Sequence, residues 1–281
     1  MGDRVNFRGP SCFCAKMNRL QLVEIEDLPW CPRFLRDAAT DYLRFIFTLT
    51  HQYQPVGKLL KSMLRRHGRN RIVDLGSGSG GPWQSLADQV QLTGEHSVKI
   101  ALTDKYPRAR DQAVVDRLDE RLTYVSYPVD ATNVPPRLAG IRTMFTAFHH
   151  FDPESARAVL RDAAQRGEPI AIFEVTQRSA VAVGTVAISP ALVLLFTPFI
   201  RPFTWSRLVF TYLLPALPLF VLFDGLVSCL RSYSPNELLR IAREADVDGF
   251  AWESGTLATR TPLPVTYLVG YPVDVAGSAT N

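Results

Sequence analysis

The stretch RIVDLGSGSGGPW, residues 71–83, places four glycines and two serines directly behind a short apolar run that contains one aspartate. An apolar run that ends in glycines predicts a buried strand, then a tight turn, then the start of a helix. Such a turn lets the backbone approach a ligand closely, and the first N–H groups of the helix attract an anion. The spacing of Gly76, Gly78 and Gly81 also fits G-x-G-x-x-G, which binds dinucleotides. The glycines alone therefore do not decide the ligand, and a turn that binds nothing stays an alternative.

Short apolar runs and amphipathic segments alternate on either side of this loop. Asp152 is the expected N-cap of one of the helices, and Pro153 is its first residue. We predict strands at 71–76, 98–104, 122–130, 141–148 and 169–175, and helices at 82–92, 107–118 and 153–166. This alternation is typical of a parallel sheet with helices on both faces. Residues 70–178 are therefore expected to form an α/β core.

The same pattern returns after an interruption, over residues 233–281. Ser234 and Glu237 have the spacing of a capping box, which predicts a helix. Two strands joined by a short turn-rich loop follow it. We expect this part of the chain to complete the core.

The segment before the core is predicted to be helical. The run PRFLRDAATDYLRFIFTL, residues 32–49, has apolar residues at helical spacing. Pro55 opens a second helix, which ends in basic residues and a glycine. We therefore expect a helical cap over residues 28–69, preceded by a flexible segment over residues 1–27.

Three aspartates follow or precede the loop at positions that suggest one ligand. Asp74 stands two residues before the first glycine, where a dinucleotide-binding strand usually carries an apolar residue. Its carboxylate suits a ligand with an ammonium group. Asp104 can accept hydrogen bonds from two ribose hydroxyls, and Asp130 from an exocyclic amine. An amino acid, a ribose and an adenine in that order describe S-adenosylmethionine.

Four segments now carry a resemblance to a known family. VDLGSGSG, LTDKYP, VDATNVP and FTAFHHF, which begin at residues 73, 102, 129 and 145, resemble the successive motifs of the class I S-adenosylmethionine-dependent methyltransferases. The resemblance implies a doubly wound, seven-stranded, Rossmann-like α/β sheet, mostly parallel with the last strand antiparallel. It implies S-adenosylmethionine as the cofactor. One departure is that Pro82 and Trp83 follow the glycines directly.

The resemblance also implies which residues bind the cofactor. The methionine end would be lined by Asp74, Gly76, Ser77, Gly78 and Gly80. Asp104 would hold the ribose, and Asp130 with the backbone of Ala131 would hold the adenine.

The candidate catalytic residues are His150, His149 and Glu174, at the ends of the fourth and fifth strands. A histidine of near-neutral pKa can act as general base, and we prefer His150 slightly. The alternatives are packing of a histidine against the cofactor and a structural hydrogen bond of Glu174. The Asn/Asp-Pro-Pro-aromatic motif of enzymes that methylate nucleic-acid bases is absent at this point, and adjacent histidines there resemble the small-molecule branch of the family. No metal site is predicted, since in-line methyl transfer needs none.

A hydrophobic insertion separates the two parts of the core at residues 179–232. Residues 179–200 and 208–223 contain no charged side chain. Five prolines break any straight helix in this region, and Arg201 and Arg207 would lie in the turn of a spanning hairpin, against the usual charge bias. We therefore expect a hairpin that dips into one leaflet and attaches a cytoplasmic protein to the membrane through residues 179–231. A spanning hairpin and a buried lid or dimer face are the alternatives.

Composition narrows the class of partner. The formal charge of +4, from 31 basic and 27 acidic residues, is too small and too dispersed to indicate nucleic acid. The cysteines, Cys12, Cys14, Cys31 and Cys229, lack the paired spacing of a zinc site or a disulfide framework. They are expected to be reduced thiols of a cytoplasmic protein, and no apolar run of signal-peptide length marks the first twenty residues.

The predicted function is methylation of a small, lipophilic molecule at or near a membrane, with S-adenosylmethionine as donor. The insertion leaves the sheet at the carboxyl end of the fifth strand, where ligands of doubly wound sheets bind, so its apolar residues should face the substrate. The alternatives are an NAD-type oxidoreductase and a non-catalytic S-adenosylmethionine-binding module that engages a membrane.

Overall fold

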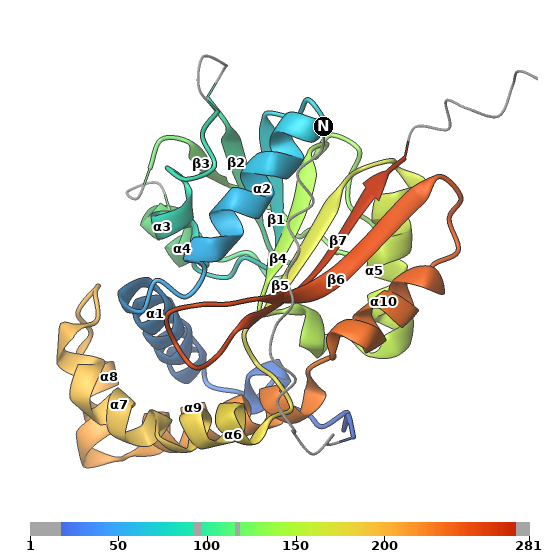
Figure 1. Cartoon of the computed structure of the whole chain (residues 1–281). Helices are drawn as coiled ribbons and strands as arrows, with labels where there is room; N and C mark the ends of the chain where they lie inside the picture. Colours follow the sequence, from blue (N-terminus) through green and yellow to red (C-terminus); the bar gives the residue numbers. More distant parts are fainter. Residues whose placement is uncertain (1–17, 93–96, 116–118, 274–281) are drawn as a thin grey trace, which may run out of the picture.

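The computed structural model describes residues 18–92, 97–115 and 119–273, which build a seven-stranded sheet with helices on both faces (Figure 1). The strands are β1 (Arg71–Leu75), β2 (Lys99–Thr103), β3 (Leu122–Tyr124), β4 (Ile141–Phe145), β5 (Ile170–Glu174), β6 (Phe250–Leu257) and β7 (Val265–Pro272). Their order in the sheet is β3-β2-β1-β4-β5-β7-β6, and β7 runs antiparallel to both of its neighbours. The predicted doubly wound sheet with one antiparallel strand is confirmed.

The helices fall into three groups. The cap contains α1 (Arg33–Leu49) and α2 (Gln54–Arg66); the core contains α3 (Trp83–Leu86), α4 (Ala109–Val115), α5 (Pro153–Gln165) and α10 (Pro235–Arg243); the insertion contains α6 (Ala180–Ala187), α7 (Ser189–Phe196), α8 (Trp205–Leu208) and α9 (Ala216–Arg231). Short 3₁₀ turns lie at η1 (Ile25–Asp27), η2 (Phe148–His150) and η3 (Thr197–Phe199), and a π-helical turn at η4 (Val209–Leu213). The predicted N-cap Asp152 accepts the N–H of Ser155, and the predicted capping box at Ser234 is formed.

Three predicted elements are shorter than expected, and one of them is the strand predicted at 141–148, which ends at Phe145. The helix predicted at 82–92 is regular only over Trp83–Leu86, because the N–H of Gln89 then bonds to the carbonyl of Leu86 in 3₁₀ fashion. The strand predicted at 122–130 ends at Tyr124. β3 is the edge strand, and Pro128 has no N–H to extend the ladder.

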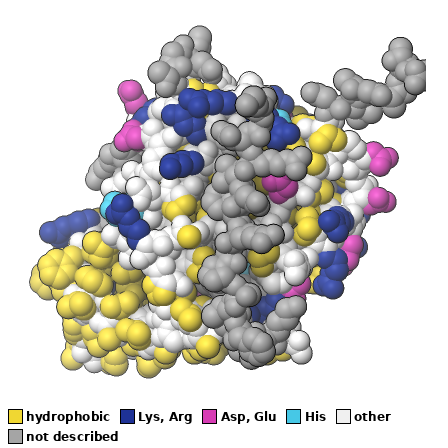
Figure 2. All heavy atoms as spheres, viewed as in Figure 1, with side chains coloured by type: hydrophobic (Ala, Val, Ile, Leu, Met, Phe, Trp, Pro, Cys, Tyr) yellow, Lys and Arg dark blue, Asp and Glu magenta, His cyan; other side chains and the backbone are white. Residues whose placement is uncertain are grey.

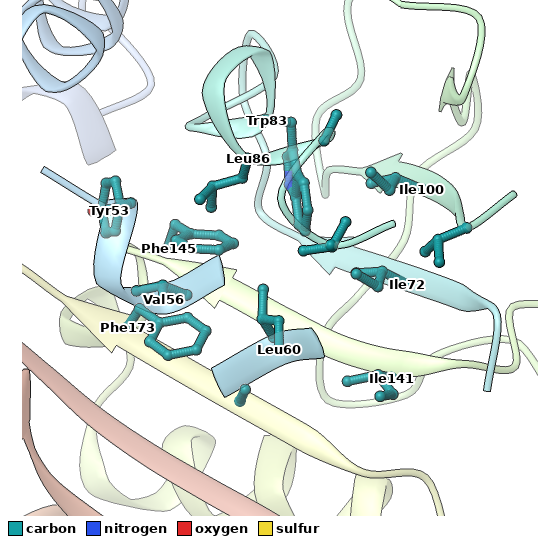
Figure 3. Close-up of a cluster of buried hydrophobic side chains, with 14 of the residues drawn as sticks. Tyr53, Val56, Leu60, Ile72, Trp83, Leu86, Ile100, Ile141, Phe145 and Phe173 are labelled. Atoms are coloured by element: carbon teal, nitrogen blue, oxygen red, sulfur yellow. The ribbon is translucent and has the colours of Figure 1, made fainter. Parts of the chain in front are cut away.

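Each face of the sheet has its own apolar core. One face packs against α2 and α3, where Leu60, Trp83 and Phe145 lie among the fully or nearly fully buried side chains of Figure 3. The other face packs against α5 and α10, with Leu160 and Leu238 completely buried. Because both faces are covered, the strands are near-continuous apolar runs, as expected for a parallel sheet.

A third apolar cluster joins α1 to the insertion. Tyr42 of α1 packs with Val193 of α7 and Phe220 of α9, all nearly or fully buried. Arg207, at the end of α8, is also buried and lies 3.4 Å from the carboxylate of Asp41. The helical cap predicted at 28–69 therefore has two roles: α2 covers the sheet, and α1 holds the insertion.

Residues 18–27 pack against α9 of the insertion. The carboxylate of Asp224 in α9 accepts the N–H groups of Ile25 and Glu26 at 2.7 and 3.1 Å, and Leu20 donates to the carbonyl of Leu230 at 3.0 Å. The flexible segment predicted for residues 1–27 is therefore too long at its carboxyl end, because α9 supplies partners for this backbone. Residues 1–17, with Cys12 and Cys14, lie outside the described residues.

The outer face of the insertion is apolar and exposed. Figure 2 shows hydrophobic side chains gathered over this part of the molecule, and the most exposed include Leu195, Phe199, Trp205, Leu213 and Leu219. By length and composition, Ala180–Phe199 could cross a bilayer, and only 22% of its most apolar 18-residue window is buried. The second apolar stretch is bent by 83° between Leu213 and Ala216.

Candidate active site

The glycine loop follows β1 and is held by hydrogen bonds from two neighbouring strands. Gly76, Gly78 and Gly80 have φ angles of 66°, 49° and 100°, which glycine adopts without strain. Asp74 is buried, and its two carboxylate oxygens accept the hydroxyls of Ser77 and Thr143, each at 2.6 Å. Burial raises the pKa of Asp74 to about 6, although these hydroxyls oppose the shift. Asp74 therefore stabilises the loop through its hydrogen bond with Ser77 and links it to β4 through Thr143.

Asp104 and Asp130 follow β2 and β3 on the same edge of the sheet. One oxygen of Asp104 accepts the N–H of Gly78 at 3.0 Å and the other that of Tyr106 at 2.8 Å. Asp130 accepts the N–H and hydroxyl of Thr132, which lower its pKa together with the ammonium of Lys105 at 3.1 Å. Its side chain is 42% exposed, and the following Ala131 is buried. The structure thus brings the loop and these two carboxylates to one edge.

The loop also touches the end of β4. A Cβ added to Gly76 would lie 3.5 Å from the Cβ of Ala147. Thr146, the residue before Ala147, has a φ of 44°, which is strained for a β-branched side chain. Its hydroxyl is hydrogen-bonded to that of Tyr53, at the start of α2. Backbone strain of this kind clusters at functional sites.

His149 and Glu174 form a buried pair beside this strained turn. The Nδ1 atom of His149 lies 2.7 Å from Oε2 of Glu174. The other oxygen of Glu174 accepts the N–H groups of Ala147 and Phe148 at 3.1 and 2.7 Å. Burial alone would raise the pKa of Glu174, but His149 and the Phe148 N–H lower it overall. A carboxylate at Nδ1 fixes the imidazole so that Nε2 carries the lone pair.

His150 is held by acidic side chains from the N-terminal segment. Its Nδ1 lies 2.9 Å from Asp27, and its Nε2 lies 3.5 Å from Glu26 and 3.7 Å from Glu24. Burial and His149 lower the pKa of His150, yet the hydrogen bond to Asp27 and the nearby carboxylates raise it overall. A raised pKa favours the protonated form, which cannot accept a proton.

Glu24 completes this cluster and was not predicted. It is buried, lies 3.6 Å from Nε2 of His149, and also contacts the guanidinium of Arg231 at 3.3 Å. Burial is the main reason that its pKa rises to about 8. Glu24, His149 and His150 together offer three ligand atoms within 4.8 Å of one another, a group able to hold a metal ion. No local pattern in the sequence connects Glu24 to the end of β4, so the sequence indicated no metal site.

The cluster forms the polar floor of an apolar cavity of about 350 Å³. Its walls come from α1, from the inner faces of α6 and α7, and from α9, as with Ile46, Val186 and Phe220. Thr146, His149 and His150 line it at the mouth of the sheet. The volume and the apolar lining are those of a small-molecule site.

Solved structures provide the comparison at this point. No protein-family model and no curated protein matches the chain. The plantazolicin methyltransferase BpumL in complex with SAH superposes with a TM-score of 0.51 at 10% identity, over 88% of this chain and 92% of that one. The same enzyme with a monoazolic desmethylPZN analog and SAH gives a TM-score of 0.54 at 8% identity, over 84% and 90%.

The chain has the class I methyltransferase fold. Its seven strands have the order described above, with β7 antiparallel, and the glycine loop follows β1. The predicted site residues occupy two adjoining regions: the loop with its aspartates, and the cavity floor with its histidines.

Proposed function

We propose that this protein is an S-adenosylmethionine-dependent methyltransferase that acts on a small lipophilic molecule. The observation that carries the proposal is the contact between the glycine loop and the end of β4, where Thr146 and His149 open into the apolar cavity. A methyl donor on the loop would lie beside a substrate in the cavity. The likeness to an enzyme solved with SAH supports this donor.

The cofactor would lie along the edge formed by the loop and the ends of β2 and β3. Gly76, Ser77, Gly78 and Gly80 would receive its methionine end, because their backbone leaves room for close approach. Both oxygens of Asp74 already accept hydroxyls, so we propose that Asp74 attracts the ammonium group through its charge while it braces the loop.

Asp104 and Asp130 would bind the ribose and the adenine of the cofactor. Asp104 would accept the ribose hydroxyls, and its present bond to the N–H of Gly78 couples ribose binding to the loop. Asp130 and the backbone of Ala131 would receive the adenine, since the carboxylate of Asp130 is partly exposed.

His149 is the better candidate for the general base, which reverses the sequence-based preference for His150. Glu174 holds Nδ1 of His149, which leaves the Nε2 lone pair to accept a proton in a side chain that lines the cavity. A substrate hydroxyl or amine would attack the methyl carbon, the sulfur would keep the electrons of the broken S–C bond, and Nε2 would take the proton. His150, with its raised pKa and its acidic neighbours, would add positive charge to the floor.

The insertion supports both a lipophilic substrate and contact with a membrane. Its inner face lines the cavity, while its outer face exposes large apolar side chains such as Trp205 and Leu213, 74% and 76% exposed. The turn that follows α7 is tied to α1, since Arg44 donates to the carbonyl of Arg201 and Arg207 lies against Asp41. In a hairpin that spans the bilayer, this turn would lie on the opposite side of the membrane from the cap. Its contacts with α1 therefore favour a hairpin that lies in one leaflet.

Cofactor binding tests the first part of the proposal. Titration of the purified protein with S-adenosylmethionine, SAH and NAD should show binding of the first two and none of the third. Binding of NAD alone would favour the oxidoreductase instead. Binding of S-adenosylmethionine without methyl transfer to any lipid or soluble extract would leave the non-catalytic module.

A further inference from the structure

We propose that Glu24, His149 and His150 bind a divalent transition-metal ion at the floor of the cavity. Two imidazole nitrogens and one carboxylate are a common ligand set for such ions, among them Zn²⁺. The site requires no methyl transfer, and it involves Glu24, which lies far from the other two residues in sequence.

The orientation of the two imidazoles is the first argument. Each Nδ1 atom is held by a carboxylate, that of His149 by Glu174 at 2.7 Å and that of His150 by Asp27 at 2.9 Å. Metal-binding histidines are almost always oriented this way by a second group on the far nitrogen. Both Nε2 atoms thereby lie on the same side, near Glu24, and a bound ion would displace the proton that the acidic neighbours favour on His150.

The distances are the second argument. Nε2 of His149 lies 3.6 Å from one oxygen of Glu24, and Nε2 of His150 lies 3.7 Å from the other. These separations are too long for good hydrogen bonds. Two ligands at about 2.1 Å from a tetrahedral ion lie about 3.4 Å apart, so small side-chain movements would close the site.

The charge around the site is the third argument. Four carboxylates surround the two imidazoles: Glu24, Glu26, Asp27 and Glu174. The guanidinium of Arg231 contacts Glu24 and Asp27 and balances part of this charge. Acidic side chains therefore outnumber the guanidinium of Arg231 around the two imidazoles, a setting that suits a divalent cation once the ligand atoms have lost their protons.

An ion at this position would have a free coordination site toward the cavity. On the proposed methyl transfer, on which this role rests, the ion would bind the substrate hydroxyl and lower its pKa. The proton would then pass to Glu26, which also lines the cavity, and His149 would be a ligand in place of its role as base. Both roles need the Nε2 lone pair that the bond from Nδ1 to Glu174 preserves.

Metal content tests the site without any assay of activity. Untagged protein is stripped with a chelator and titrated with Zn²⁺, and with Co²⁺ for its visible absorption. We expect one tightly held ion per chain, and binding at least about tenfold weaker in Glu24→Gln and in His150→Gln. The control is His51→Asn, which changes an exposed histidine with a φ of 50° to a residue that tolerates this backbone.

These measurements distinguish a metal site from a cluster of ion pairs. The proposal is overturned by wild-type protein that binds neither ion, or by folded variants that bind as the wild type does, which would leave an ion-pair cluster only. Should a variant not fold, X-ray absorption of the wild-type Co²⁺ form decides: scattering from two imidazoles is expected, and its absence contradicts the site. Cofactor affinity in the same samples tests the proposed function separately, so either idea can fail alone.

Discussion

Replacement of Glu174 by glutamine tests the assigned role of the buried pair at the end of β4. Glu174 has no exposed surface and accepts hydrogen bonds from the N–H groups of Ala147 and Phe148 and from Nδ1 of His149. Glutamine keeps one oxygen for the two backbone groups. The atom that faces His149 becomes an NH₂ donor, so Nδ1 can no longer donate to it.

The expected loss follows from this change of donor. His149 must place its proton on Nε2 to accept from the glutamine, and the Nε2 lone pair is then lost. A misplaced general base costs about 10²–10⁴ in rate. One charge-assisted hydrogen bond is lost as well, which should lower the free energy of unfolding by about 2 kcal/mol. Cofactor affinity should not change, because the predicted cofactor contacts are untouched.

The assay compares kcat for methyl transfer, urea unfolding and S-adenosylmethionine titration in the same preparations. Glu168→Gln is the matched control, because Glu168 is also a buried carboxylate and accepts the N–H of Gly140 at 3.0 Å, away from the cavity residues. It should lose stability and keep its rate. A Glu174→Gln variant with wild-type kcat would refute the assignment of His149 as a base positioned by Glu174.

Three further predictions concern the loop and the insertion. Gly78→Val should abolish cofactor binding, because a β-branched residue is strained at a φ of 49° and its side chain fills the loop. The control is Gly68→Val, which also has a positive φ, 57°, but has no neighbour within 4 Å, and it should bind the cofactor normally. Relative to Asp74→Asn, the wild type should lose about 2 kcal/mol of unfolding free energy between pH 4 and pH 7.5, because burial raises the pKa of Asp74 to about 6 and its ionisation then opposes folding. Parallel pH curves would contradict this. The double variant Trp205→Glu, Leu213→Glu should bind lipid vesicles at least about tenfold more weakly, because burial of one such apolar side chain contributes about 1.5–3 kcal/mol. The control is Val273→Glu, which changes an exposed residue outside the insertion and should bind vesicles as the wild type does.

The fold could be predicted because it depends on local, repeated patterns. Apolar runs and amphipathic helices alternate through the core, and signals such as the capping box at Ser234 mark their limits. The glycines and Asp104 stand next to strand ends, so their meeting at one edge follows from the parallel sheet alone. Element lengths were less predictable: β3 ends early because an edge strand and a proline have few partners to extend the ladder.

The cavity floor could be predicted only in part. His149 follows β4, and Glu174 ends the adjacent parallel strand β5. Both were predicted as candidate catalytic residues at strand ends, and the structure pairs them. Glu24 and Asp27 reach His150 from a segment more than 120 residues earlier, through single polar contacts that leave no periodic signal. The packing of α1 on the insertion could not be predicted either, because the sequence pattern of an amphipathic helix does not indicate which apolar surface packs against it. Point substitutions are therefore preferable to removal of residues 179–231, which would uncover α1.

The most direct test of the account is transfer of a labelled methyl group from S-adenosylmethionine by the purified protein to an organic extract of membranes. We expect label in an apolar product, with no such product from the Gly78→Val variant. Label found only in water-soluble metabolites would contradict the lipophilic substrate. No label above that of the variant in any fraction would contradict methyl transfer itself.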